Sequence, residues 1–169
     1  MQHLWLIGMM GSGKSEVGRR IAELTETRLI DLDERIVADQ RRSISEIFAS
    51  EGEMAFRRRE RTALETAAHE LPAVIATGGG VVTSDGIAAI MRETGTVIYL
   101  NAEPATLAMR IGEEPGRPLL AGGDRVGILS EILRQRAPLY EGAAHHMIET
   151  EGLTIDEIAG KAVGLWNRS

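Results

Sequence analysis

The sequence predicts a three-layer α/β fold, in which a parallel sheet of five strands is covered by helices on both faces. Short apolar runs alternate along the chain with longer amphipathic segments, which is the pattern of repeated crossover units. The first apolar run, Leu4 to Ile7, is followed at once by a glycine-rich loop and then by a helical pattern. This order of strand, loop and helix is typical of parallel α/β folds.

The candidate strands are short, and the clearest is Thr96 to Leu100, which is rich in β-branched and aromatic residues. The five strands are expected at residues 4–7, 29–30, 73–76, 96–100 and 147–148. The segments between them have apolar residues at helical spacing, and some are expected to break into two helices. They are residues 16–24, 33–41, 43–69, 85–92, 104–111, 124–144 and 154–166.

The glycine-rich loop has the spacing of a phosphate-binding loop, Gly-x4-Gly-Lys-Ser, over residues 8–15. Glycines at this spacing let successive backbone N–H groups turn towards phosphate oxygens at the start of a helix. Lys14 then reaches the β- and γ-phosphates of ATP, and the Ser15 hydroxyl contacts Mg²⁺. The loop therefore predicts a P-loop kinase fold and a nucleotide site at Gly11, Ser12, Gly13, Lys14 and Ser15. A glycine-rich turn without a ligand is the alternative.

Length and composition indicate one domain over residues 1–169. A chain of 169 residues with 43% hydrophobic and 26% charged residues has enough residues for one core and too few for two. Its net charge of −6 argues against a broad surface for nucleic acid or for an anionic membrane. The chain has no cysteine, and we find no signal peptide or membrane helix in it. We expect a cytoplasmic monomer.

Two carboxylates follow the second candidate strand. Asp31 and Asp33 lie two residues apart, and in an extended chain such residues face the same side. Both are therefore expected at the carboxyl edge of the sheet, where doubly wound folds bind ligands. One carboxylate can support Mg²⁺, and the other can orient a substrate hydroxyl or accept its proton. In the alternative interpretation, Asp33 only caps a helix that begins at Glu34.

Residues 52–60 place three arginines on one predicted helix. Successive helical residues project about 100° apart, so only one of Arg57, Arg58 and Arg59 can face a given pocket. The other two are expected in solvent. Glu53 lies four residues before Arg57 and can pair with it along the helix, which is also the purely structural interpretation of this run.

Two glycine-rich segments lie further along the chain. Thr77 to Gly80 closes the third strand, where the missing side chains let a ligand lie against the backbone, although a tight turn without a ligand explains it equally well. Residues 112–123 are dense in glycine and proline and too long for a routine connection. We expect a mobile lid there, with Arg117 arriving at the transferred phosphoryl group. The alternative is a surface loop with an incidental arginine.

Taken together, these segments resemble the shikimate kinase family over nearly the whole chain and in the same order. The resemblance implies phosphorylation of the 3-hydroxyl of shikimate by ATP, with Mg²⁺, in the route to aromatic amino acids. The matching pieces are residues 6–15, Asp31-Leu32-Asp33, Ile47-Phe48, Gly52-Glu53, Phe56-Arg57, Thr77 to Gly80, Arg117-Pro118-Leu119-Leu120 and Arg136-Ala137-Pro138-Leu139-Tyr140.

The resemblance also implies a substrate-binding region at about residues 31–61 and a role for each site residue. Two arginines grip the shikimate carboxylate, and guanidinium groups suit this because they bind carboxylates through paired hydrogen bonds. Asp33 orients the 3-hydroxyl, while Lys14 and Arg117 stabilise the phosphoryl group and Arg110 lies against adenine. Shikimate contacts Asp33, Arg57, Gly78, Gly79, Gly80 and Arg136. The metal site is Ser15, with Asp31 behind it.

One residue of the nucleotide site departs from the family pattern. Glu16 stands where relatives usually have a small or hydroxyl residue, and its carboxylate would repel the α-phosphate if it pointed inwards. We expect it to point into solvent, because the helix dipole favours a glutamate in the first turn. The alternatives to a shikimate kinase are a gluconate or nucleoside monophosphate kinase and a nucleotide-binding module without turnover.

Overall fold

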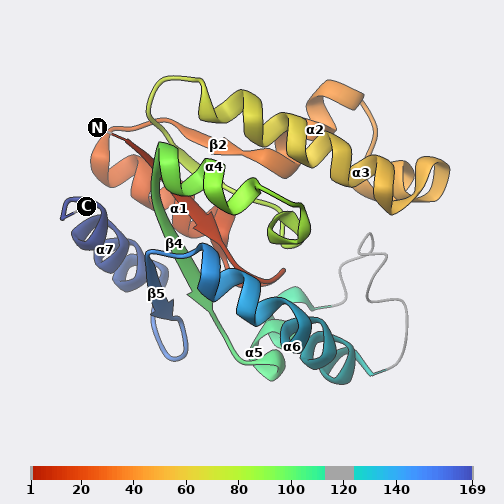
Figure 1. The fold of residues 1–169 in the computed structure, drawn as a ribbon. Coiled ribbons are helices and arrows are strands. Elements are labelled where there is room, and N and C mark those ends of the chain that lie inside the picture. Colours follow the sequence, from red (N-terminus) through yellow and green to blue (C-terminus); the bar gives the residue numbers. More distant parts are fainter. Residues whose placement is uncertain (1, 113–123, 169) are drawn as a thin grey trace.

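The structure is a computed structural model that describes residues 2–112 and 124–168. Its centre is one parallel sheet with the strand order β2-β3-β1-β4-β5 (Figure 1). The strands are β1 (His3–Ile7), β2 (Leu29–Asp31), β3 (Val74–Ala76), β4 (Gly95–Asn101) and β5 (His146–Glu149). The central strand β1 pairs on both sides, with Trp5 opposite Ile75 of β3 and Val97 of β4. The predicted count of five parallel strands is confirmed.

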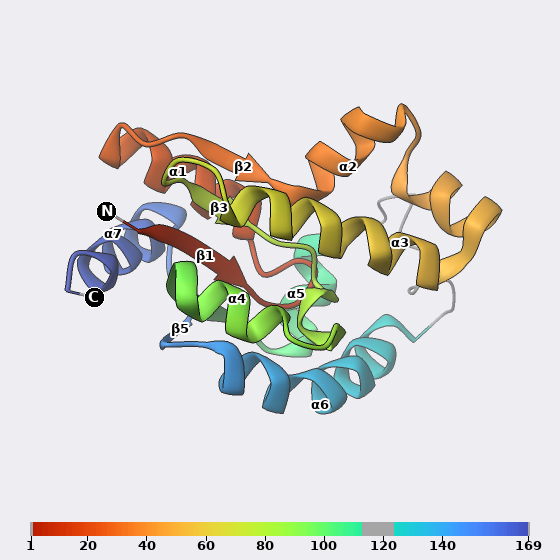
Figure 2. The same ribbon diagram turned by 45° about the horizontal axis from the view of Figure 1, so that its top comes forward.

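Helices cover both faces of this sheet (Figure 2). On one face, α1 (Lys14–Thr25) and α7 (Ile155–Trp166) share an apolar core with the sheet. A larger core holds the other elements together. These are α2 (Leu32–Gln40), α3 (Ile44–Ala68), the 3₁₀ turn η1 (Val81–Thr83), α4 (Ile87–Thr94), α5 (Pro104–Ile111) and α6 (Arg125–Ala143).

The two cores meet across β1 because its side chains alternate between the faces of the sheet. Leu4 and Leu6 belong to the core beneath α1 and α7, whereas Trp5 and Ile7 belong to the larger one. All of these side chains are buried. A strand that is covered on both faces is a continuous apolar run in the sequence. This explains why the sequence predicts β1 correctly.

Among the boundaries that differ from the predicted ones, two matter for the site and its surroundings. The helix after β2 begins at Leu32, so Asp33 is helical and the extended geometry expected for it is wrong. Helix α4 begins at Ile87, after the turn η1. Within α3, Gly52 has φ 80° and ψ 173° and kinks the helix, a backbone conformation that glycine adopts readily because it has no Cβ. The expected break of a long helix is therefore found there.

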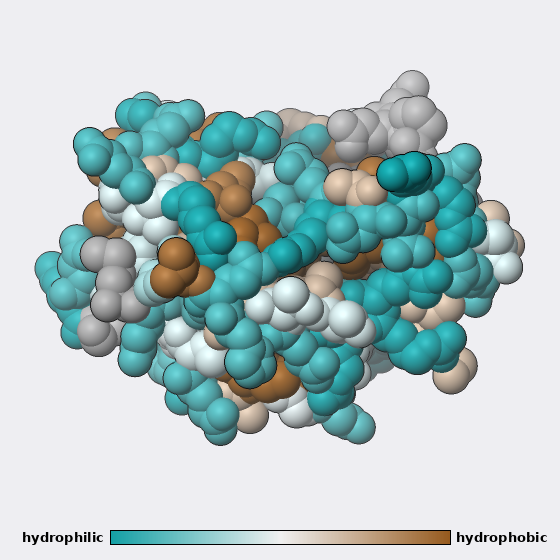
Figure 3. All heavy atoms as spheres, turned by 90° about the horizontal axis from the view of Figure 1, so that it is seen from above, coloured by the Kyte–Doolittle hydropathy of each residue, from teal (hydrophilic) through white to brown (hydrophobic). Residues whose placement is uncertain are grey.

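The surface is mainly polar on the face seen in Figure 3, where hydrophobic residues show in separate small areas among hydrophilic ones. Within the described ranges, no helix combines the length and the apolar character that a membrane span requires.

Candidate active site

The phosphate loop joins the end of β1 to the start of α1. Gly11 and Gly13 have φ values of 79° and 90°, which side chains with a Cβ rarely adopt. Gly11 is also confined, because a Cβ built there would lie 2.8 Å from the Ile111 side chain. The two glycines shape the loop, and helix α1 begins directly behind it at Lys14.

The Lys14 side chain is buried and folds back over its own loop. Its Nζ donates to the carbonyl oxygens of Gly8 at 2.9 Å and Met9 at 2.8 Å and to the Ser12 hydroxyl at 3.3 Å. Carbonyl and hydroxyl oxygens thus surround the ammonium group at the mouth of the loop. A phosphate group placed there would meet the ammonium group and the N-terminus of α1 together.

Ser15 and Asp31 form the second part of the site. The Ser15 hydroxyl donates to Oδ2 of Asp31, while Oδ1 of the same carboxylate accepts from the backbone N–H of Asp33 at 3.0 Å and of Glu34 at 3.2 Å. Asp31, not Asp33, is therefore the N-cap of α2. This corrects the interpretation in which Asp33 caps a helix that begins at Glu34.

The hydroxyl and carboxylate oxygens of this pair suit Mg²⁺, which takes one or two protein oxygens and completes its shell with phosphate and water. No cluster of three or more histidine, aspartate or glutamate side chains in the described ranges could hold a metal by itself. A magnesium site built from protein groups alone is therefore not found in those ranges, and Ser15 with Asp31 fits one that is completed by a nucleotide.

Arg57 on α3 is fixed by two carboxylates of its own helix. Its Nη2 lies 3.0 Å from Oε1 of Glu53, as the four-residue spacing predicts, and its Nη1 donates to Oε2 of Glu60 at 2.8 Å. Glu60 is completely buried. Burial raises the pKa of its carboxyl group, against the opposing effect of the Arg57 guanidinium. This arrangement leaves Arg57 with little rotational freedom.

The glycines after β3 accommodate these charged side chains. A Cβ at Gly78 would lie 2.1 Å from Oε1 of Glu60, and one at Gly80 would lie 2.1 Å from Nη1 of Arg57. A side chain at either position would therefore displace one of these charged groups. Neither interpretation of the sequence contained this reason for the glycines.

Helix α6 is attached to the same loop. Nη1 of Arg136 donates to the carbonyl oxygen of Gly79 at 3.1 Å, and the Tyr140 hydroxyl donates to the same oxygen. Both side chains are buried, and burial raises the pKa of Tyr140 to about 12. Tyr140 thus remains a hydrogen-bond donor at neutral pH. The loop after β3 brings Arg57 of α3 and Arg136 of α6 to the same segment of chain.

A cavity of about 480 Å³ joins the phosphate loop to the start of α2 and to the loop after β3, and Arg57 and Arg136 are not among the residues that line it. Lys14, Ser15 and Glu16 of α1 line it together with Asp33 of α2 and Gly79 of the loop after β3. The Asp33 carboxylate and the Lys14 side chain therefore open onto one space. Such an arrangement can hold a hydroxyl next to a terminal phosphate.

Arg110 of α5 also lines this cavity. It is exposed, and its guanidinium donates to the Thr150 hydroxyl at 3.0 Å and to the Thr150 carbonyl oxygen at 3.3 Å. Arg117 and the predicted lid, residues 112–123, lie outside the described residues except for Gly112.

Two further side chains depart from the sequence interpretation. Glu60 was not predicted as part of the site, because a glutamate that follows three arginines on a helix looks like an exposed partner for one of them. Its only signal in the sequence is its position three residues after Arg57, on the same helical face. Arg59 is not simply in solvent, because its Nη2 pairs with Oε2 of Glu51 at 2.7 Å.

Comparison with known proteins decides the family. A family model described as shikimate kinase matches residues 10–165. The chain belongs to the shikimate kinase family. A curated shikimate kinase of Symbiobacterium thermophilum is 42% identical over 158 residues, which cover 92% of this chain and 91% of the relative. Another, from Paracidovorax citrulli, is 46% identical over 148 residues, covering 86% and 81%.

Solved structures agree with this assignment. Shikimate kinase from Acinetobacter baumannii in complex with shikimate is 34% identical, with a TM-score of 0.95 over 98% of this chain and 92% of that one. A gluconokinase from Sinorhizobium meliloti is 17% identical with a TM-score of 0.59, covering 99% of this chain and 92% of that one. That likeness shows a common fold alone. The protein is an ATP-dependent kinase that phosphorylates shikimate in the shikimate pathway.

Proposed function

We propose that this chain transfers the γ-phosphoryl group of ATP to the 3-hydroxyl of shikimate within the cavity between the phosphate loop and α2. The observation that carries the proposal is that Lys14, Asp33 and Gly79 line one cavity, while Arg136 and Arg57 meet at the loop that contains Gly79. Residues 31–61 would then be the substrate-binding region.

The shikimate carboxylate is held by Arg57 and Arg136. Each guanidinium carries five N–H donors, and Nη1 of Arg136 donates to the Gly79 carbonyl oxygen. Both arginines are largely buried. The Arg57 side chain is 16% exposed, and Arg136 as a whole residue is 9% exposed. A charge-assisted hydrogen bond at such a position is stronger than one in water.

Asp33 orients the 3-hydroxyl and accepts its proton as the oxygen attacks the γ-phosphorus. The bond between that phosphorus and the β,γ-bridging oxygen breaks, and ADP leaves. Lys14 stabilises negative charge on the transferred group, as does the N-terminus of α1. Gly78 and Gly80 leave room for the charged groups around the substrate.

Mg²⁺ binds at the Ser15 hydroxyl with Asp31 behind it, and when bound it neutralises phosphate charge. Asp31 keeps the Ser15 hydroxyl oriented through the hydrogen bond between them. Gly11, Ser12 and Gly13 surround the phosphates, and Arg110 lies against the adenine ring. Because the reaction consumes ATP, we place the protein in the cytoplasm.

The test is a coupled assay of ADP release with shikimate, gluconate and nucleoside monophosphates in parallel. Turnover is expected with shikimate alone. Asp33→Asn should lower kcat by about 10²-fold or more, because general base catalysis contributes about 10²- to 10⁴-fold, while Arg136→Ala should mainly raise KM for shikimate. Arg134→Ala is the matched control, since Arg134 is exposed on α6 and pairs with Glu131. Turnover with shikimate that neither site variant changes would disprove the assigned roles.

A further inference from the structure

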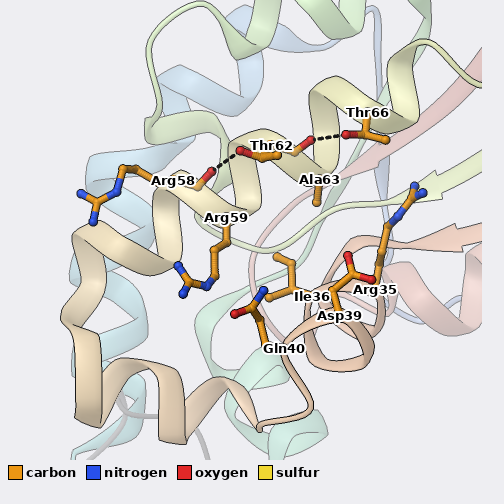
Figure 4. A pocket seen from close by; sticks show the side chains of 9 residues that line it. All are labelled: Arg35, Ile36, Asp39, Gln40, Arg58, Arg59, Thr62, Ala63 and Thr66. Atoms are coloured by element: carbon orange, nitrogen blue, oxygen red, sulfur yellow. Dashed lines mark hydrogen bonds between the residues drawn. The ribbon is translucent and has the colours of Figure 1, made fainter.

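A second cavity of about 370 Å³ lies between α2 and α3, outside the active site (Figure 4). It shares no lining residue with the cavity at the phosphate loop. Ile36 of α2 and Ala63 of α3 give it an apolar surface, and both are buried. Helix α3 directs Arg57 towards the active site, and Arg59, about 200° further around the helix, lines this cavity.

The guanidinium of Arg59 carries a hydrogen-bond donor that residues 2–112 and 124–168 leave without a partner. Its Nη2 pairs with Glu51 at 2.7 Å, but its Nε is buried and has no hydrogen-bond partner within the described part of the chain. Buried N–H groups in folded proteins are nearly always hydrogen-bonded. In Figure 4 the Arg59 side chain extends from α3 towards α2, on the side where Gln40 lies. This end of the cavity therefore offers donors to an anionic group.

The rest of the wall offers acceptors. Thr62 donates its hydroxyl hydrogen to the Arg58 carbonyl at 3.0 Å, and Thr66 donates to the Thr62 carbonyl at 2.8 Å (Figure 4). With their hydrogens committed, both hydroxyl oxygens can only accept further bonds. Asp39 adds a carboxylate. Donating groups of a ligand, such as hydroxyls, match this part of the cavity.

Two more arginines line the cavity, Arg58 from α3 and Arg35 from α2, and Arg35 pairs with Oε1 of Glu70 at 2.5 Å. The arginines on the wall outnumber its one carboxylate, Asp39, although the chain as a whole has a net charge of −6. The carboxylates that pair with Arg35 and Arg59 are shared with further arginines, Glu70 with Arg28 and Glu51 with Arg42. Positive charge around the cavity therefore exceeds negative charge, which favours an anion over a neutral or cationic molecule.

We propose that this cavity binds a small hydroxylated organic anion, with its carboxylate or phosphate group on Arg59 and Gln40 and its hydroxyl groups on Asp39 and the threonines. The site is separate from catalysis and does not depend on the roles assigned there. The cavity lies between α2, which carries Asp33, and α3, which carries Arg57.

The test uses the full chain with MgADP and shikimate at saturating concentration, so that the probes cannot bind at the active site. Glycerol 3-phosphate and glycerate are titrated separately, with glycerol as the neutral control, while NMR follows the Nε–H signal of Arg59. The signal is assigned by its loss in Arg59→Gln. Calorimetry then compares affinities in Arg59→Gln and Arg61→Gln, both checked for folding by thermal melting. Arg61 is the matched control, because it lies on the same helix, pairs with Glu65 and does not line the cavity.

A saturable shift of the Arg59 signal with one or both anions, and none with glycerol, is expected. Whichever anion binds identifies the acidic group. Arg59→Gln should weaken binding by about tenfold or more, as loss of a charge-assisted hydrogen bond predicts, and Arg61→Gln by less than about twofold. The proposal is overturned by the absence of a saturable shift with either anion, by equal binding of glycerol, or by an equal loss of affinity in the two variants.

Discussion

Nη1 of Arg57 donates a hydrogen bond of 2.8 Å to Oε2 of Glu60, a carboxylate with no exposed surface. This hydrogen bond holds Arg57, the arginine that we assign to the substrate carboxylate, in place. It also requires that the Glu60 carboxylate be buried. Burial raises the pKa of Glu60, and the nearby Asp33 adds to this effect while Arg57 opposes it. The free energy of unfolding should therefore depend on pH through Glu60.

The first prediction concerns this pH dependence. A carboxyl group whose pKa is raised on folding stabilises the protein fully below its unfolded pKa, and this contribution is lost as the pH rises through the folded pKa. The ordinary pKa of this group is 4.5. The difference in the free energy of unfolding, wild type minus Glu60→Gln, should thus be largest below pH 4.5 and should decrease above it. Urea unfolding between about pH 4 and pH 8 measures the difference. A difference that grows with pH would mean that the ion pair dominates instead.

The second prediction concerns the glycines that face these charges. A Cβ at Gly80 would meet the guanidinium of Arg57 at 2.1 to 2.3 Å, whereas one at Gly142 of α6 would meet nothing within 4 Å. Gly80→Ala should displace Arg57 and raise KM for shikimate about tenfold, the loss of one charge-assisted bond. Gly142→Ala should leave KM unchanged and stabilise the protein by about 0.5–1 kcal/mol. Steady-state kinetics and urea unfolding of both variants provide the measurement, and equal KM values would contradict the steric argument.

The fold was predictable because buried parallel strands leave continuous apolar runs and because the phosphate loop has a fixed spacing. The strand count and the Glu53–Arg57 pair followed from periodicity alone. The burial of Glu60 did not, since it depends on how α3 packs against the loop after β3. The N-cap role of Asp31 was not predicted, because local sequence does not tell whether the chain stays extended to Asp33 or becomes helical already at Leu32.

The third prediction separates the N-cap role of Asp31 from the metal role that we propose for it. Asparagine caps helices about as well as aspartate, so Asp31→Asn should change the free energy of unfolding by less than about 0.5 kcal/mol. The variant loses the negative charge next to Ser15, and the Mg²⁺ concentration for half-maximal activity should rise about 10- to 100-fold. Asp31→Ala should show the same Mg²⁺ effect and lose about 1 kcal/mol of stability in addition. Titration of activity with Mg²⁺ and urea unfolding without it check both parts. An unchanged Mg²⁺ requirement in Asp31→Asn would exclude the metal role.

The fourth prediction concerns Glu16, which is exposed at the start of α1 and lines the cavity at the phosphate loop. An exposed carboxylate at this place repels the nucleotide phosphates weakly, because water and salt screen it. Glu16→Thr should therefore lower KM for ATP several-fold at most, about the equivalent of 1 kcal/mol, and leave kcat nearly unchanged. Glu16→Gln, which keeps the size and removes the charge, should reproduce most of the gain, and high salt should reduce it in both variants. Steady-state kinetics at two ionic strengths distinguish these effects. A large increase in kcat would show that Glu16 points inwards and acts on the reacting phosphate.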